Sequence, residues 1–150
     1  MQGVETMRPF KISLDKHSYR VKPTDREEIG QISIRIGNNP VQVNSSNIRE
    51  IVKDIATNGC SFAPATFHDE LRRKDNFKQM QLLPLDFDGT ISYEDYRKRA
   101  ERYELKSLFE YETLTSTDKN MFRVCFLNSG FITDIKGTDI IMRYISVSMR

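Results

Sequence analysis

Residues 81–90 read QLLPLDFDGT, a short apolar run that ends in two aspartates and a glycine. Successive side chains of a β-strand point to opposite sides, so a strand over 81–88 would sort these residues onto two faces. One face would carry Leu83, Leu85 and Phe87, and the other would carry Asp86 and Asp88. Pro84 lacks the N–H that a strand ladder needs. The strand therefore either lies at an edge at Pro84 or begins its pairing after it.

The residues before this strand predict shorter strands and one helix. Alternating apolar residues indicate strands at 10–14, 19–21 and 32–36. A helix is predicted to start after Asn47, which can cap it, with Glu50 at its third position and with Asn58 and Gly59 at its end. Its apolar stripe would be Ile48, Ile51, Val52 and Ile55. Residues 60–67 are apolar and predict another strand, whereas residues 68–79 are polar and indicate a loop.

The residues after this strand continue the mixture of helices and strands. Ser92 can cap a second helix, with Asp95 at its third position. The packing face of this helix would be Tyr93, Tyr96, Ala100 and Tyr103. Two strands follow at 107–115 and 121–127, joined by a turn at 116–120, and the last sixteen residues indicate a helix. This order predicts a mixed α/β or α+β fold, with residues 1–150 forming a single domain.

The composition limits the classes of function. Of the 150 residues, 38% are hydrophobic and 29% are charged, as in an ordinary globular domain. The net charge is only +2, so a nucleic-acid function would rest on a local basic patch. No signal peptide and no apolar run of ~20 residues is apparent, and we expect a cytoplasmic protein with no membrane partner. Cys60 and Cys125 are far apart and predict reduced core residues rather than a disulfide or zinc site.

Asp86 and Asp88 form the sharpest chemical feature of the sequence. Two carboxylates on one face of a strand repel each other unless a cation or a shared proton relieves them. Mg²⁺ or Mn²⁺ suits such a pair, because hard cations prefer oxygen ligands, and a pair of these ions can clamp the oxygens of a nucleotidyl transfer. The alternative is turn chemistry, in which Asp caps backbone groups and Gly89 supplies a positive φ.

Residues 85–91, LDFDGTI, resemble the first motif of haloacid-dehalogenase-type phosphatases. That resemblance implies that Asp86 is a nucleophile and that Asp88 is a general acid and base. It also implies a doubly wound fold with this motif near the N-terminus and a late acidic pair. Eighty-five residues precede Asp86, and Asp134 and Asp139 stand alone after it, so the match ends at one motif.

A longer resemblance covers most of residues 55–135. The chain is similar, in the order and spacing of its segments, to archaeo-eukaryotic-type primase–polymerase domains that plasmids, phages and integrated mobile elements of bacteria encode. The segments are GCSFAPATF at 59–67, RRKDNF at 72–77, the strand and aspartate pair at 81–89, YETLTS at 111–116, FRVCFL at 122–127 and ITD at 132–134. The resemblance implies synthesis of DNA on a template from nucleoside triphosphates, with two Mg²⁺ or Mn²⁺ ions, for the replication of a mobile element.

The resemblance also implies roles for particular residues. By position, Asp86 and Asp88 match the family's first catalytic motif and would be catalytic metal ligands. The second motif supplies a histidine that contacts the triphosphate and the third supplies another acidic ligand, and both normally lie beyond the equivalent of residue 150. His17 and His68 precede the aspartate pair and match neither. We therefore expect the N-terminal part of a primase–polymerase-like core, inactive by itself and completed by another chain or by a C-terminal region.

The predicted nucleotide- or nucleic-acid-binding residues are Arg72, Arg73, Lys74, Lys78 and Arg123. The first four lie in the 68–79 loop around Phe77, a combination that suits phosphate contacts and base stacking, although a solvated basic surface is the alternative. Arg123 would need an anion if it is buried, and either a phosphate or Glu110 or Glu112 of the adjacent strand would provide one. A further alternative for the whole chain is a degenerate domain that only binds DNA or a partner protein.

Overall fold

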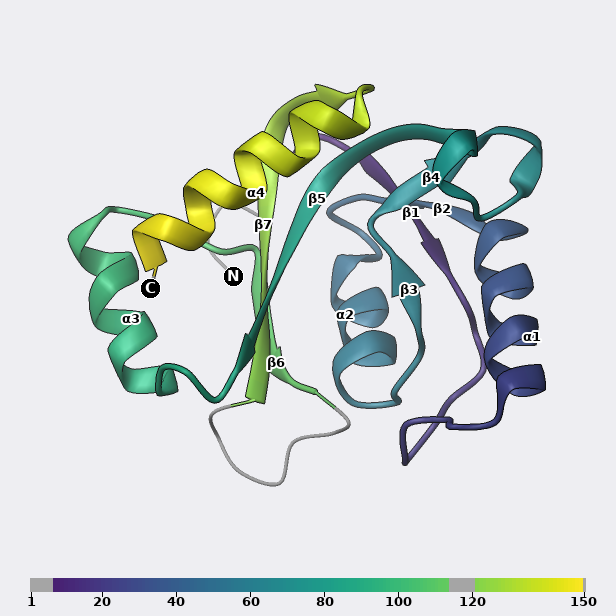
Figure 1. Cartoon of the computed structure of the whole chain (residues 1–150), viewed down its shortest axis with the longest axis horizontal. Helices are drawn as coiled ribbons and strands as arrows, with labels where there is room; N and C mark the ends of the chain where they lie inside the picture. Colours follow the sequence, from purple (N-terminus) through teal and green to yellow (C-terminus); the bar gives the residue numbers. More distant parts are fainter. Residues whose placement is uncertain (1–6, 114–120, 150) are drawn as a thin grey trace.

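The structure is a computed structural model that describes residues 7–113 and 121–149, which form two antiparallel sheets and four α-helices (Figure 1). In chain order the elements are β1 (Phe10–Leu14), α1 (Arg26–Gly37), β2 (Pro40–Val43), α2 (Ile48–Ala56), β3 (Phe62–Ala63), β4 (Ala65–Phe67), β5 (Phe77–Asp88), α3 (Tyr93–Arg102), β6 (Phe109–Glu112), β7 (Met121–Ile132) and α4 (Ile135–Met149). The first sheet has the order β2-β1-β3 and the second sheet the order β4-β5-β7-β6. The predicted mixed α/β class is confirmed.

The first sheet is built around β1, which confirms the strand predicted at 10–14. β1 pairs with β2 on one side and with β3 on the other. Helix α2 also follows the prediction, because its apolar stripe joins the core of this sheet through Ile48, Ile51 and Ile55. Asn47 precedes α2, but its side chain accepts from the Asn44 N–H (2.8 Å) and donates to the Gln42 carbonyl (2.9 Å) instead of capping the helix.

The strands predicted at 19–21 and 32–36 are wrong. Residues 19–21 belong to no strand and include a bend at 20 and 21, and residues 32–36 belong to α1. Asp25 caps this helix by accepting from the Glu28 N–H at 3.2 Å. Ile32 and Ile36 are buried, one helical turn apart, whereas Ile34 is 55% exposed. The apolar alternation was therefore misleading, because the isoleucine between the two buried ones lies on the outer face of a helix.

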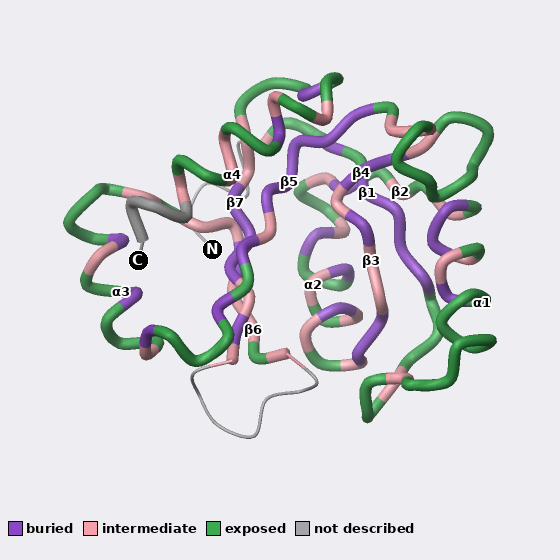
Figure 2. The backbone as a smooth tube through the Cα atoms, in the orientation of Figure 1, coloured by how far each residue is buried: buried purple, intermediate pink, exposed green. Residues whose placement is uncertain are grey.

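The second sheet packs through both of its faces (Figures 1 and 2). On one face Leu83, Leu85 and Phe87 of β5 share a core with β7, α3 and α4, as the predicted alternation requires. The Phe87 ring stacks on Phe122 of β7, with ring centroids 4.7 Å apart. The opposite face turns toward the first sheet and α2, where Leu82 packs in the same core as Phe10.

At Pro84, β5 is an edge strand of the second sheet, as the first of the two expectations for this residue stated. Strand β4 pairs with β5 only at the N-terminal part of β5, as far as Met80. Beyond that point the described pairing of β5 is with β7 alone, and Pro84 lies opposite Cys125. The missing N–H of Pro84 therefore costs no ladder hydrogen bond on the other side.

Three other boundaries differ from the predictions. The apolar stretch 60–67 divides at Pro64 into β3 of the first sheet and β4 of the second. The polar loop contains two 3₁₀ turns and ends earlier than expected, because β5 already begins at Phe77. The strand predicted at 107–115 is shortened to β6, and the turn predicted at 116–120 falls outside the described residues, as do 114 and 115.

The two C-terminal helices confirm their predictions in outline. Ser92 caps α3 by accepting from the Asp95 N–H at 3.1 Å. Tyr96 and Ala100 are buried in the core, but Tyr103 follows the helix as its C-cap and is 53% exposed.

No helix in residues 7–113 and 121–149 is long and apolar enough to cross a membrane. Cys60 and Cys125 are both buried and free, as predicted.

Candidate functional site

One face of the second sheet changes from apolar to acidic along β5. Leu82 is buried on this face, whereas Asp86 and Asp88 are exposed. The three residues are separated by even numbers of positions in one strand, so their side chains point to the same side. The acidic end of β5 is therefore the place where this face leaves the core that it shares with the first sheet and reaches solvent.

A cleft of about 550 Å³ opens at this acidic end. The second sheet lines it with Asp86, Asp88, Tyr111 and Arg123, and Thr113, directly after β6, also lines it. The facing wall is mainly apolar. Ile29, Ile32 and Ile36 of α1 form its main part, the isoleucine wall, and Ile55 of α2 and Phe62 of β3 complete it. Two cationic residues from connecting segments, Lys22 and Arg72, also line the cleft. The cleft thus combines carboxylates and cations beside an apolar wall.

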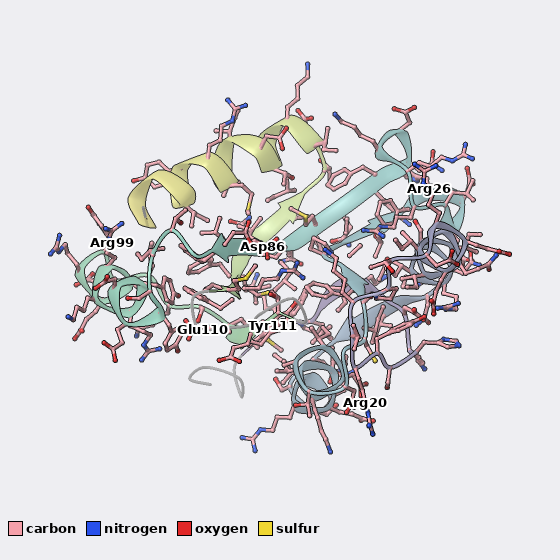
Figure 3. The ribbon with its side chains drawn as sticks, turned by 60° about the horizontal axis from the view of Figure 1, so that its bottom comes forward. Arg20, Arg26, Asp86, Arg99, Glu110 and Tyr111 are labelled. Carbon is pink, nitrogen blue, oxygen red and sulfur yellow. The ribbon has the colours of Figure 1, made fainter. Side chains whose placement is uncertain are left out.

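Asp86, Arg123 and Tyr111 lie in a row across three neighbouring strands. Arg123 of β7 is directly opposite Asp86 of β5 and also directly opposite Tyr111 of β6. The guanidinium donates to the Asp86 carboxylate from Nε (2.5 Å) and from Nη2 (3.3 Å), and to the Tyr111 hydroxyl from Nη1 (2.8 Å). Figure 3 shows Asp86 and Tyr111 near the middle of the molecule. Arg123 thus supplies a positive charge that relieves the repulsion expected between the two aspartates.

The partner of Arg123 differs from the glutamates considered from the sequence. Neither Glu110 nor Glu112 pairs with it, because Asp86 holds this place. Glu110 instead accepts from the Tyr93 hydroxyl at 2.6 Å and from the Ser107 hydroxyl at 3.1 Å. Cross-strand register explains the difference, since Glu110 and Glu112 lie opposite Val124 and Phe122, on the other side of the pleat from Arg123.

The surroundings of Arg123 and Tyr111 in this row shift the pKa values of both side chains. Burial acts to lower the pKa of Arg123, but the hydrogen bond to Asp86 and the neighbouring negative charge outweigh it and raise that pKa. Burial raises the pKa of Tyr111 to about 12, although the charge of Arg123 opposes this. Arg123 is therefore a permanent cation and Tyr111 a neutral phenol at physiological pH.

Asp88 differs from Asp86 in having no such partner. Among the described residues, no hydrogen bond or ion pair engages its carboxylate, which lies opposite Met121 of β7 and faces the cleft. The next residue, Gly89, has a φ of +89°, as the turn interpretation predicted. The turn and the site are compatible, because the turn ends β5 while the Asp88 side chain lines the cleft.

Arg72 is the predicted basic residue that reaches the cleft from the loop before β5. Within the described part of the chain no carboxylate pairs with it. The residue as a whole is exposed, yet burial of its guanidinium lowers its pKa. A guanidinium without a counter-ion in the described part of the chain has a free capacity to bind an anion, and phosphate groups match its geometry.

The other predicted basic residues lie elsewhere. Lys78 is on β5 and lines a separate cavity of about 690 Å³, next to β1 and β4. Arg73 and Lys74 are exposed and line neither this cavity nor the cleft. The structure therefore brings Asp86, Asp88, Arg72 and Arg123 together and separates the three other predicted residues from them.

The two carboxylates suit a divalent cation only in part. Within residues 7–113 and 121–149, no group of three His, Cys, Asp or Glu side chains is placed to hold a metal ion. Two aspartates are nevertheless a sufficient protein contribution for Mg²⁺, which usually keeps several waters and takes its other ligands from substrate phosphates. The donor set therefore fits a cation that arrives with a phosphate-bearing ligand better than a cation held by the protein alone.

Three features of the site were missed from the sequence: the pairing of Arg123 with Asp86, the cleft position of Lys22 and the isoleucine wall. The spacing of Ile32 and Ile36, one helical turn apart, could have indicated that wall. Comparisons of the chain with protein-family models, with curated proteins and with solved structures find no significant match.

Proposed function

We propose that the cleft is the metal-dependent nucleotide site of a primase–polymerase-like domain, with Asp86 and Asp88 as the ligands of Mg²⁺ or Mn²⁺. One observation carries this proposal: the same cleft contains a carboxylate, Asp88, and a guanidinium, Arg72, that have no hydrogen-bond or ion-pair partner among residues 7–113 and 121–149. A metal-bound triphosphate complements both, because its cation binds carboxylates and its phosphate oxygens bind guanidinium groups.

The residues of the chain have distinct roles in this proposal. Asp86 and Asp88 hold the cation, while Arg72 and Lys22 bind phosphate oxygens. The isoleucine wall of α1 excludes water from one side of the cleft and offers an apolar contact to the base or the sugar. When bound, the cation supplies the positive charge that stabilises the transferring phosphoryl group. The remaining substrates would be a nucleoside triphosphate and a DNA template.

We further propose that the described residues make up an incomplete catalytic site. Nucleotidyl transfer by two ions requires more acidic ligands than Asp86 and Asp88, and no third one joins them among the described residues. Another chain or a C-terminal region would supply it. The purified chain is accordingly expected to bind the metal–triphosphate but not to synthesise primers on single-stranded DNA, and measurable primer synthesis would contradict the second part of this expectation.

The proposal can be tested by titrating Mn²⁺ calorimetrically into the wild type and Asp88→Asn, with and without a non-hydrolysable nucleoside triphosphate. We expect the wild type to bind Mn²⁺ more tightly with the triphosphate, and Asp88→Asn to lose most of this binding. Asp139→Asn is the matched control, because Asp139 is exposed on α4, which covers the opposite face of the second sheet. Equal binding by the wild type and Asp88→Asn, or no binding by either, would refute the metal site.

A second candidate function is a non-catalytic domain that binds DNA or a protein. It is favoured by the ion pair that already neutralises Asp86 and by the two-carboxylate limit of the described site. This function predicts that Asp86→Asn and Asp88→Asn leave DNA binding unchanged. The phosphatase alternative has less support, because β5 pairs antiparallel with β4 and β7, whereas a doubly wound sheet is mainly parallel.

A further inference from the structure

We propose that Arg123 is a built-in counter-cation that weakens the binding of free divalent ions in the cleft and makes tight binding depend on an anionic ligand. The inference rests on the proposed function and concerns the regulation of the same site. Its basis is the row formed by Asp86, Arg123 and Tyr111.

The position of Arg123 is fixed by the sheet rather than by a flexible surface contact. It is the direct cross-strand neighbour of Asp86, and side chains at such positions lie on the same face within contact distance. Two of its nitrogens donate to the two oxygens of the Asp86 carboxylate, and the third donates to the Tyr111 hydroxyl. All three nitrogens of the guanidinium are therefore engaged.

Aromatic rings also hold the guanidinium. Its central carbon lies 5.8 Å from the ring centroid of Phe62 and 5.8 Å from that of Tyr111, within the range of cation–π attraction. Tyr111 stacks on Phe109 at a centroid distance of 6.0 Å, and Phe109 is buried in the core beside the first sheet. The Arg123 side chain is 30% exposed. Hydrogen bonds and two aromatic rings thus hold the guanidinium beside Asp86.

A fixed Arg123 alters the charge that an incoming cation meets. Two ionised aspartates carry two negative charges, and Arg123 cancels one of them. The three side chains then carry a net single negative charge, and a free divalent ion is repelled by the nearby guanidinium and by Lys22 and Arg72 of the same cleft. A triphosphate bound by Arg72 brings further negative charge to the cleft and compensates for Arg123. The cation and the triphosphate are therefore expected to enter together.

Arg123 does not block the aspartate from acting as a ligand. A carboxylate offers about four lone-pair positions, and a forked guanidinium occupies two of them. The remaining positions on Asp86 are available on the side away from Arg123. Arg123 also fixes the orientation of the carboxylate, so it is a positioning residue for Asp86 in addition to its counter-charge.

The test is a calorimetric titration of Mn²⁺ alone, and of Mn²⁺ with a non-hydrolysable nucleoside triphosphate, into the wild type, Arg123→Met and Arg123→Lys. We expect Arg123→Met to bind Mn²⁺ alone about tenfold more tightly, the size of a Coulomb interaction between a monovalent and a divalent cation in water. Its gain in affinity from the triphosphate should shrink by a similar factor. Arg123→Lys retains the charge without the fork and should bind Mn²⁺ alone within about threefold of the wild type.

Arg143→Met is the control, because Arg143 is exposed on α4 and its loss removes the same net charge on the far face of the second sheet. Thermal unfolding of each variant checks that it is folded, and Tyr111→Phe provides a second variant that loosens Arg123 without changing the charge. Because a loosened Arg123 opposes the free cation less, Tyr111→Phe should bind Mn²⁺ alone more tightly than the wild type but less tightly than Arg123→Met. If Arg123→Met binds Mn²⁺ no more tightly than the wild type, this inference is overturned while the metal site stands. Absence of Mn²⁺ binding in every protein overturns both.

Discussion

Replacing Asp15 by Asn should destabilise the part of the fold that supports the isoleucine wall of the cleft. Asp15 follows β1, and its side chain is completely buried. It accepts from Arg35 of α1 through Nε at 2.9 Å and through Nη2 at 3.0 Å. Arg35 also donates to the Tyr19 hydroxyl at 2.9 Å. This forked ion pair ties α1 to the first sheet.

The expected loss in the free energy of unfolding depends on Arg35, the charged partner that remains. Removing one member of a buried ion pair costs about 3–5 kcal/mol, because the other charge is left uncompensated. The Arg35 side chain is 30% exposed and can regain part of its hydration. We therefore expect Asp15→Asn to lower the free energy of unfolding by about 2–3 kcal/mol. For a chain of 150 residues this corresponds to a fall in Tm of roughly 5–10 °C.

Urea denaturation followed by circular dichroism measures this change, with Asp139→Asn as an exposed control expected to stay within about 0.5 kcal/mol of the wild type. A double-mutant cycle with Arg35→Gln separates the ion pair from other effects, and we expect a coupling of about 1–3 kcal/mol. If Asp15→Asn costs less than about 1 kcal/mol, the buried pair does not hold α1 in the way that the contacts imply.

The same contribution should depend on pH in a defined direction. Burial acts to raise the pKa of Asp15, but the hydrogen bonds and the charge of Arg35 outweigh it, so that the pKa lies below its ordinary value. A carboxyl group with a lowered folded-state pKa stabilises the protein above its unfolded-state pKa, near 3.9, and this stability is lost as the pH falls through the folded-state pKa. The difference between the wild type and Asp15→Asn should therefore be constant above about pH 5 and shrink below about pH 4.

Two further predictions concern α1 and the cysteines. Gly37→Ala would place a Cβ 2.7 Å from the Glu70 carbonyl oxygen and 2.8 Å from the Arg72 backbone nitrogen, and should lower the free energy of unfolding by about 1–3 kcal/mol. Gly30→Ala in the same helix meets nothing within 4 Å and should raise the free energy of unfolding by about 0.5–1 kcal/mol, and equal effects of the two substitutions in urea denaturation would contradict this prediction. Burial raises the pKa of Cys125 to about 12 and also raises the pKa of Cys60, so both thiols should react slowly with iodoacetamide in the folded protein. Mass spectrometry should find both cysteines unmodified before denaturation and alkylated after it, and rapid alkylation of either one at pH 8 before unfolding would contradict their burial.

The elements that the sequence predicted well are those whose signals agree with one another. The strand β5 shows period-two alternation up to a Gly-containing turn, and α2 and α3 combine an apolar stripe with residues that favour a helix start. The helix α1 was missed because three of its four isoleucines, Ile32, Ile34 and Ile36, alternate as in a strand. The Asp25 cap and the acidic residues Glu27 and Glu28 in the first turn were the available helix signals.

The candidate site could be predicted only in its local part. The spacing of Asp86 and Asp88 places them on one strand face, and the structure confirms this. The partner of Asp86 could not be predicted in this way, because Arg123 is 37 residues away and a shift of one residue in register would move it to the other face. Arg72 likewise reaches the cleft from the loop that joins β4 to β5 of the second sheet, where no periodicity fixes the direction of a side chain.

The unequal surroundings of the two aspartates decide how substitutions at the site should be interpreted. Asp86→Asn removes a metal ligand and also leaves the guanidinium of Arg123, which is only 30% exposed, without its carboxylate. Loss of metal binding in this variant could therefore result from a displaced Arg123 as well as from a missing ligand. Asp88→Asn has no such second effect, because no described side chain depends on Asp88 for a hydrogen bond or an ion pair. If Asp88→Asn retains the stability of the wild type and loses Mn²⁺ binding, the loss reports on the cation directly, and the non-catalytic function would have no explanation for it.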